Sequence, residues 1–184
     1  MYFDCIIAGF GGQGVMLIGN ILAYAGMIED KNVTYMPVYG VEMRGGTANC
    51  TVAVSDQPVG SPIIQNPVSS IIMNLPSLEK FAPRVKKDGF IMVNSTLITD
   101  DEMIPYRDLD SVMVPTRDLA LSAGNERLAN MVMLGATIQK SSVVSLSTME
   151  AALVAGLDQK YHSMIEANLK ALEAGADFVR KAAA

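Results

Sequence analysis

Short apolar runs, each ended by a glycine, a proline or a polar residue, recur along the chain as far as Val114 and predict β-strands. The predicted strands cover residues 3–8, 33–38, 48–55, 69–74, 90–93 and 111–114. Between residues 14 and 27 the apolar positions follow a helical period instead. The first strand, this helix and the second strand therefore form a βαβ unit, whose right-handed crossover makes the two strands parallel neighbours.

The connection after the second strand predicts a change of direction. It is too short for a parallel crossover, so strand 48–55 should run antiparallel to the strand before it and make the sheet mixed. Residues 57–67 contain three prolines and a glycine, which is typical of an irregular connection. Asn74 then opens a short helix before the strand at residues 90–93.

The C-terminal part of the chain predicts helices. Asn125 is the expected N-cap of a helix reaching Lys140, whose middle is apolar on almost every side and so should be buried or covered by a partner subunit. Ser147-Thr-Met-Glu150 matches a capping box and predicts a second helix, ending near Gly156. A third helix should pack on the sheet through an apolar stripe formed by Tyr161, Ile165, Leu169, Leu172, Ala176 and Val179.

These elements and the size of the chain together predict the fold class. At 184 residues and 19.7 kDa, with 50% hydrophobic residues, the chain fits one domain with a sizeable core. Strands that alternate with helices favour three α/β/α layers around a mixed, mostly parallel, Rossmann-like sheet. We therefore expect a single α/β domain over residues 1–184.

Charge and hydropathy exclude several classes of protein. The net charge of −5 and the pI of about 4.8 argue against nucleic acid as a partner. Asp4 lies near the start without a basic region before an apolar stretch, and no segment approaches the roughly 18 apolar residues that cross a bilayer. We therefore expect a cytoplasmic protein without membrane insertion.

The residues that most often carry chemistry are few. Cys5 and Cys50 lie in apolar, strand-like runs, where cysteine is usually a small buried hydrophobe, and two cysteines cannot ligate an iron–sulfur cluster. His162 lies early in a charged helix and is assigned no chemistry. The sequence shows no metal-ligand spacing and no nucleophile with a recognisable base. The chain thus contains no catalytic residue that we can predict, and any enzyme activity must depend on cofactors held elsewhere.

The first candidate site is the glycine-rich turn after the first strand. Its sequence, Gly9-Phe-Gly-Gly-Gln-Gly14, fits G-x-G-x-x-G, in which backbone amides and a helix N-terminus attract an anion. A nicotinamide site would also need an acidic residue at the end of the second strand, where Met36-Pro-Val-Tyr39 stands instead, and a P-loop would need lysine and serine or threonine. The alternative to an anion-binding site is a tight turn between strand and helix, in which the glycines only permit close packing. The candidate binding residues are Gly9, Gly11, Gly12, Gln13 and Gly14.

The second candidate site is a glycine-framed loop between the second and third strands. Its candidate binding residues are Tyr39, Gly40, Glu42, Arg44, Gly45 and Gly46. Arg44 suits a phosphate or carboxylate, and Glu42 suits orienting Arg44 or capping amides rather than acid–base chemistry. The alternative is an exposed ion pair over a turn, worth only about 0–1 kcal/mol.

Both glycine loops follow strands that point the same way, so they should share the crevice at one edge of the sheet where α/β proteins commonly bind ligands. Asn74, Asn94 and Thr116 are expected to end neighbouring strands at this edge.

The two loops together resemble the gamma subunit of 2-oxoacid:ferredoxin (acceptor) oxidoreductases, also called the pyruvate/ketoisovalerate oxidoreductase gamma family. That family pairs a Gly-x-Gly-Gly-Gln-Gly turn with a Tyr-Gly-x-Glu-x-Arg-Gly-Gly loop. The resemblance continues along most of the chain, through Thr47-Ala-Asn-Cys50, Ser61-Pro62, Ser70-Ile-Ile-Met-Asn74 and Asn130-Met-Val-Met-Leu-Gly-Ala136.

This resemblance implies an accessory subunit of a complex that converts a 2-oxoacid, coenzyme A and oxidised ferredoxin to an acyl-CoA, carbon dioxide and reduced ferredoxin. It implies that alpha and beta subunits, and in some complexes a ferredoxin-type delta subunit, hold thiamine diphosphate, magnesium and iron–sulfur clusters. The glycine loops would then face coenzyme A or these subunits.

The segment Glu42-Met-Arg-Gly-Gly-Thr-Ala-Asn49 is more similar to the corresponding sequence of 2-oxoglutarate and branched-chain 2-oxoacid oxidoreductases than to that of pyruvate oxidoreductases. We therefore expect 2-oxoglutarate as the substrate. Two positions depart from the family pattern, Val41 in place of proline and Val68 in place of aspartate.

Two other hypotheses compete with that of an accessory subunit. One is a free-standing module that binds CoA or a nucleotide, and the other is a scaffold whose glycines only close turns.

Overall fold

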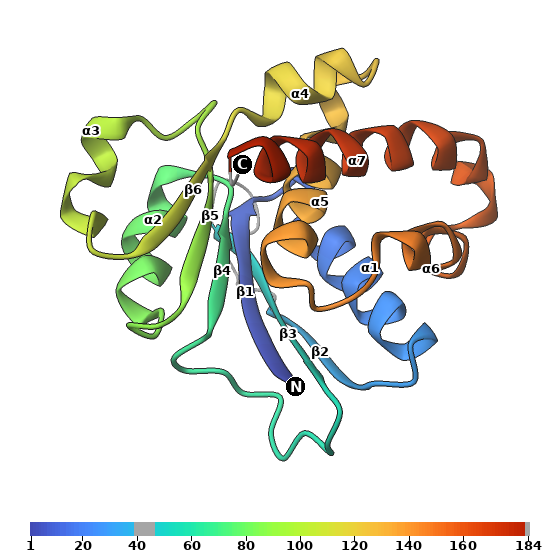
Figure 1. Ribbon diagram of the computed structural model, residues 1–184, viewed down its shortest axis with the longest axis horizontal. Helices are drawn as coiled ribbons and strands as arrows, with labels where there is room; N and C mark the ends of the chain where they lie inside the picture. Colours follow the sequence, from blue (N-terminus) through green and yellow to red (C-terminus); the bar gives the residue numbers. More distant parts are fainter. Residues whose placement is uncertain (39–46, 183–184) are drawn as a thin grey trace.

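The computed structural model describes residues 1–38 and 47–182, which form a mixed sheet with helices on both faces (Figure 1). The strands lie in the order β2-β3-β1-β4-β5-β6. Their bounds are β1 Tyr2–Phe10, β2 Asn32–Val38, β3 Thr47–Ser55, β4 Ser69–Ile72, β5 Phe90–Asn94 and β6 Asp110–Val114. The helices are α1 Val15–Ile28, α2 Leu75–Phe81, α3 Asp100–Met103, α4 Thr116–Ser122, α5 Ala129–Ser141, α6 Met149–Gly156 and α7 Ile165–Ala182. The predicted α/β class with a mixed sheet is confirmed.

The position of β3 corrects one detail of the predicted sheet. β1 and β2 are both antiparallel to β3, so they run in the same direction as expected, but β3 lies between them. The prediction that they are neighbours was therefore wrong. The crossover through α1 spans two strand positions, and the β2–β3 hairpin folds back into the space between them. On the other side of β1, the strands β4, β5 and β6 are all parallel.

Both faces of the central strand are buried. Cys5 and Ile7 of β1 point into a core beneath α1, α5, α6 and α7, whereas Ile6 and Ala8 point into a second core beneath α2 and α3. A strand covered on both faces needs apolar residues on both, which explains the apolar run from Cys5 to Ala8. The one buried charge of β1, Asp4, accepts a hydrogen bond from the Val68 amide (2.6 Å). Figure 1 shows these helices on opposite sides of the sheet.

The boundary between β1 and β4 is the point at which the chain changes face. The helix after β1, α1, packs on one face of the sheet, and the helix after β4, α2, packs on the other. Such a switch leaves a crevice beyond the carboxyl ends of the two strands, where ligands bind in open α/β sheets. The first glycine turn lies directly at this point.

The predicted helix from Asn125 is divided in two. The Asn125 side chain does cap, but it accepts from the Arg127 amide (3.0 Å) at the start of a 3₁₀ turn, and α5 begins only at Ala129. Residues 130–138 of α5 are all buried within this chain. The apolar character of this helix therefore needs no partner subunit to explain it.

The predicted capping box at Ser147 was wrong. Thr148 stands at the N-cap of α6 without a side-chain cap, and its hydroxyl instead donates to Oε1 of Glu29, the C-cap residue of α1 (2.8 Å). The same Glu29 oxygen accepts from the Ser145 amide (2.6 Å), so a neighbouring helix holds this turn. A capping box does occur elsewhere, where Thr99 and Glu102 begin α3.

Helix α7 packs chiefly on α5 rather than on the sheet, contrary to expectation. Gly135 of α5 faces the Leu172 carbonyl, and Gly175 of α7 faces the Val132 carbonyl, so closely that neither glycine has room for a Cβ. Tyr161, predicted to begin the apolar stripe, is 51% exposed in the 3₁₀ turn before α7. In the described part of the chain, no helix combines the length and hydropathy needed to span a bilayer.

Candidate functional site

The turn between β1 and α1 presents backbone amides at the switch point of the sheet. Gly12 and Gly14 have φ angles of 95° and 72°, in the left-handed region that favours glycine. The Gln13 amide donates to the Phe10 carbonyl oxygen (3.1 Å) and closes the turn. Among the residues that the structure describes, no side chain caps the first turn of α1, and no acidic residue lies in that turn. The partial positive charge of this helix end is therefore available to an anion.

The Gln13 side chain holds the turn rather than projecting from it. Its Oε1 accepts from the Phe10 amide (2.6 Å) and from Asn74 Nδ2 (3.3 Å), and its Nε2 donates to the Met73 carbonyl oxygen (3.2 Å). A Cβ at Gly9 would lie 2.7 Å from Gln13 Oε1 and 2.8 Å from Met73 Cβ. Gly9 and Gln13 thus shape the turn, and their contact with a ligand stays a prediction.

Polar side chains continue this network across the ends of β4, β5 and β6. Asn94 Nδ2 donates to the Met73 carbonyl oxygen (3.2 Å), and Thr116 Oγ1 donates to Asn94 Oδ1 (2.6 Å). Asn74 caps α2 by accepting from the Ser77 amide (3.0 Å). Asn74, Asn94 and Thr116 are 1–3% exposed, so their hydrogen bonds are formed out of contact with solvent. The expectation that these three residues meet at one edge is confirmed.

Asn130 is a member of this site that the sequence did not single out. It is the second residue of α5 and 7% exposed, and its Nδ2 lies 3.5 Å from the Gly14 carbonyl oxygen. The Asn130 amide fills the space that a Cβ on Gly14 would occupy. The N-terminal turns of α1 and α5 therefore converge on one loop. Asn130 begins the last stretch of family resemblance, which was the only available signal.

The second glycine loop, with Tyr39, Gly40, Glu42, Arg44, Gly45 and Gly46, lies outside the described residues. The residues on either side of it are placed by the sheet. Val38 pairs with Asn49, and Thr47 pairs with Phe10, the last residue of β1. The loop thus starts and finishes at the edge that carries the first glycine turn, as the sequence predicted.

The two cysteines do not fit an iron–sulfur cluster or a reactive thiol. Cys5 and Cys50 are fully buried in the core beneath α1. Burial raises the pKa of both thiols, that of Cys50 to about 12, so the thiolate that binds metals is disfavoured. Among residues 1–38 and 47–182 there is no group of three or more His, Cys, Asp or Glu side chains able to hold a metal ion.

Comparison with known proteins identifies the family. The model of the pyruvate ferredoxin/flavodoxin oxidoreductase family matches residues 4–178. The chain belongs to this family. The 2-oxoglutarate synthase subunit KorC of Methanocaldococcus jannaschii is 32% identical over 177 residues, which cover 95% of this chain and 92% of that protein.

The ketoisovalerate oxidoreductase subunit VorA of Methanothermobacter marburgensis is 35% identical over 187 residues. These cover 95% of this chain but 36% of VorA, so the chain spans about a third of that relative's length. The crystal structure of a keto/oxoacid ferredoxin oxidoreductase gamma subunit from Geobacter sulfurreducens is 27% identical, with a TM-score of 0.82 over 97% of this chain and 99% of that one. The resemblance to the gamma subunit is therefore confirmed.

Proposed function

We propose that this chain is the gamma subunit of a cytoplasmic, thiamine-dependent 2-oxoacid:ferredoxin oxidoreductase complex. The complex would convert a 2-oxoacid, coenzyme A and oxidised ferredoxin to an acyl-CoA, carbon dioxide and reduced ferredoxin. Cleavage of the carbon–carbon bond and electron transfer require thiamine diphosphate, magnesium and iron–sulfur clusters, which we assign to alpha, beta and ferredoxin-type delta subunits. This chain itself contributes no catalytic residue.

We assign to this chain the binding of coenzyme A or of the catalytic subunits through the edge at the β1–β4 switch point. The observation that carries this proposal is the uncapped first turn of α1, which faces the same loop as the N-terminal turn of α5. Coenzyme A carries phosphates, which backbone amides at a helix N-terminus bind well. Arg44 of the neighbouring loop adds a cation suited to a second phosphate or a carboxylate.

The substrate we propose is 2-oxoglutarate. Relatives of about this length include 2-oxoglutarate synthase subunits KorC and also an indolepyruvate oxidoreductase subunit, IorB, while VorA is named for ketoisovalerate, so a branched-chain 2-oxoacid is the main competing substrate. Turnover of the purified complex with 2-oxoglutarate, ketoisovalerate and pyruvate at equal concentrations decides between them. A preference for pyruvate would contradict both assignments.

Affinity purification of the tagged full-length chain from its own cells tests the assembly. We expect stoichiometric recovery of a thiamine-binding partner, detected by native mass spectrometry. Recovery of a lone monomer that binds CoA tightly would favour the second candidate function, a free-standing CoA- or nucleotide-binding module. The uncapped α1 turn is the feature that supports that alternative, because it needs no residue from another chain.

The substitution Arg44→Ala in the reconstituted complex tests whether Arg44 binds coenzyme A. Loss of a charged hydrogen bond worth about 1.5–3 kcal/mol should raise the KM for CoA by roughly tenfold or more and leave the KM for the 2-oxoacid unchanged. Arg107→Ala, in an exposed turn before β6, is the matched control. Equal kinetics for the two variants would instead support a loop that only closes a turn.

A further inference from the structure

A group of basic residues lies at the end of α2 and in the turn that follows it. Lys80, Arg84, Lys86 and Lys87 fall between Glu79 and Asp88, so four cations accompany two carboxylates in a chain of net charge −5. We call these four residues, together with Ile63, the basic face. A local excess of one charge that opposes the charge of the whole protein is typical of a surface that recognises a partner.

No carboxylate in the described part of the chain forms an ion pair with these cations. Lys31, Lys140, Lys160, Lys170 and Arg180 each form an ion pair within the described residues. None of the four cations of the basic face forms an ion pair within residues 1–38 and 47–182. Their charge is therefore available to an external anion.

Two of these cations are held in place by a buried ring and by a loop. Lys80 Nζ and Arg84 Cζ lie 5.3 and 5.5 Å from the centroid of the Phe81 ring. Arg84 also donates to the carbonyl oxygens of Ile64 and Gln65, each at 2.8 Å. Groups fixed in this way lose less conformational entropy when a partner binds.

The two lysines that follow stand on a fixed turn. The Lys86 amide donates to the Pro67 carbonyl oxygen (3.0 Å), and the Gly89 amide donates to the Lys86 carbonyl oxygen (2.9 Å). Gly89 is also packed so closely against the Val68 carbonyl that it has no room for a Cβ. The backbone that carries Lys86 and Lys87 is therefore tied to the segment before β4.

An exposed apolar side chain adjoins the cations. Ile63 is 67% exposed, and it immediately precedes the residue whose carbonyl binds Arg84. Protein interfaces combine an apolar anchor with charged residues around it, whereas polyanions such as nucleic acids do not need the anchor. The combination favours a protein partner.

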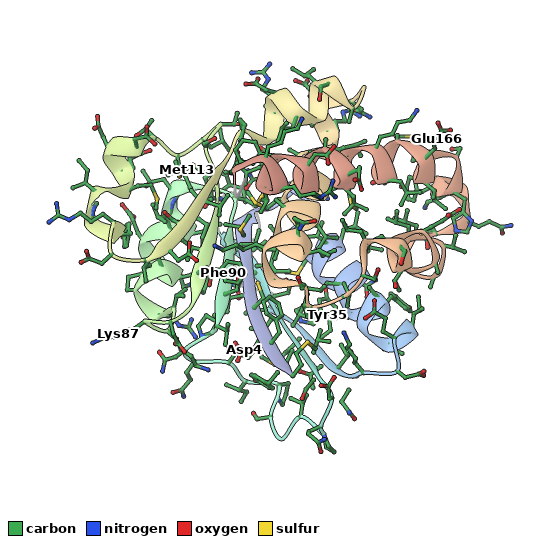
Figure 2. All side chains as sticks on the ribbon, in the orientation of Figure 1. Asp4, Tyr35, Lys87, Phe90, Met113 and Glu166 are labelled. Atoms are coloured by element: carbon green, nitrogen blue, oxygen red, sulfur yellow. The ribbon has the colours of Figure 1, made fainter. Side chains whose placement is uncertain are left out.

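The basic face lies at the opposite end of the sheet from the candidate ligand edge. Lys87 is close to the start of β5, while the polar network lies at the carboxyl ends of the strands, near Met113 (Figure 2). A partner could therefore cover the basic face without obstructing the ligand edge.

We propose that the basic face docks on an acidic surface of another subunit of the complex. This inference rests on the proposed function, because it requires that such a complex exists. Attraction between the four cations and clustered carboxylates would speed association and fix the orientation of the subunits, and contact with Ile63 would add a component that does not depend on salt.

Reassembly of the full-length chain with the remaining subunits tests the proposal. The test variant is Lys86→Glu/Lys87→Glu, since neither side chain forms an ion pair with another described residue. Lys170→Glu/Lys181→Glu, on the exposed side of α7, makes the same change in net charge and is the control, although it also removes the exposed ion pair between Lys170 and Glu166, which contributes little at a surface. Affinity is measured by native mass spectrometry or light scattering at low and high salt, after equal thermal unfolding of the variants has been verified.

We expect the test variant to bind about tenfold or more weakly at ~0.1 M salt, with a smaller difference near ~1 M, where charges are screened within about 3 Å. Ile63→Ala should weaken binding at both salt concentrations. Equal affinities for the test and control variants would overturn the proposal, as would normal assembly combined with slower reduction of ferredoxin. If the wild-type chain joins no complex, the proposed function fails as well, so the wild-type arm reports on the function and the variants on the docking surface.

Discussion

Gln13 and Met73 are joined by a hydrogen bond between the Gln13 carboxamide and the Met73 carbonyl oxygen (3.2 Å), although 60 positions separate them in the chain. The same Met73 oxygen accepts from Asn94 (3.2 Å), so the ends of β1, β4 and β5 meet at a single carbonyl. The conformation of the first glycine turn is therefore coupled to the end of β5. Substitutions in this network should act on the turn and on stability together.

Gln13→Glu isolates the bond to Met73. A glutamate can still accept from the Phe10 amide, but it sets a carboxylate oxygen against the Met73 carbonyl where an amide now donates. The free energy of unfolding should fall by about 2 kcal/mol, as for a buried hydrogen bond replaced by a repulsive contact. Urea unfolding measures this. A variant as stable as wild type would show that the bond contributes nothing.

The crossing of α5 and α7 provides a second prediction. Gly175→Ala should lower the free energy of unfolding by about 3 kcal/mol, since its new methyl group meets the Val132 backbone, which cannot move aside as a flexible side chain can. Gly60→Ala is the control, because a Cβ there meets nothing within 4 Å. Equal midpoints of thermal unfolding for the two variants would contradict the observed helix crossing.

The buried thiols predict slow chemical modification. Burial raises the pKa of Cys50 to about 12, so at pH 8 only about one thiol in ten thousand is the reactive thiolate. A disulfide reagent should therefore modify neither Cys5 nor Cys50 within an hour in the native protein, and both after unfolding. Fast reaction of one native thiol would mean that this part of the core opens readily.

Glu29 predicts a loss of stability in acid. Partial burial opposes ionisation of Glu29, but hydrogen bonds from Ser145, Lys31 and Thr148 outweigh it and lower its pKa below the ordinary value of 4.5. The unfolded state thus binds the proton more tightly. The ionised group therefore stabilises the fold above the unfolded pKa, and this contribution is lost as the pH falls through the folded pKa.

The measurement compares Glu29→Gln with wild type from about pH 7 to pH 3. We expect wild type to be more stable at neutral pH and the difference to vanish in acid. Glu79→Gln, on an exposed surface of α2, controls for removal of a carboxylate in general. A difference between Glu29→Gln and wild type that does not change with pH would assign the effect to packing rather than to charge.

The sequence predicted the strands well because their signals are local. The apolar run around Ile6 and Ile7 and the glycine at position 9 define β1 without reference to the rest of the chain. The order of the strands is not local. Nothing in residues 47–55 indicates that this strand inserts between β1 and β2, since its length and direction would suit an edge position equally well.

The candidate site was predicted in part for the same reason. Gly12 and Gly14 were found because positive φ angles leave a glycine signature in the sequence. Asn130 was missed as a site residue, because the helix was predicted to begin at Asn125, which placed Asn130 inside an apolar helix and away from its capped end. The prediction that Ser147 is a cap was wrong, since a local pattern cannot reveal that Glu29, distant in the sequence at the end of α1, binds Thr148.

The central position of β1 has a consequence for how the chain folds. β1 is the first strand in the sequence, yet its two neighbours in the sheet are residues 47–55 and 69–72. It cannot complete its pairing until both later segments have been made and brought back to it. The chain must therefore lose the entropy of closing long loops before the strands at the centre of the sheet form their stabilising contacts. This makes folding slower than in proteins whose strands pair with neighbours in the sequence. Until then at least one edge of the apolar β1 is exposed, and a nascent chain stalled before residue 69 would be prone to aggregation.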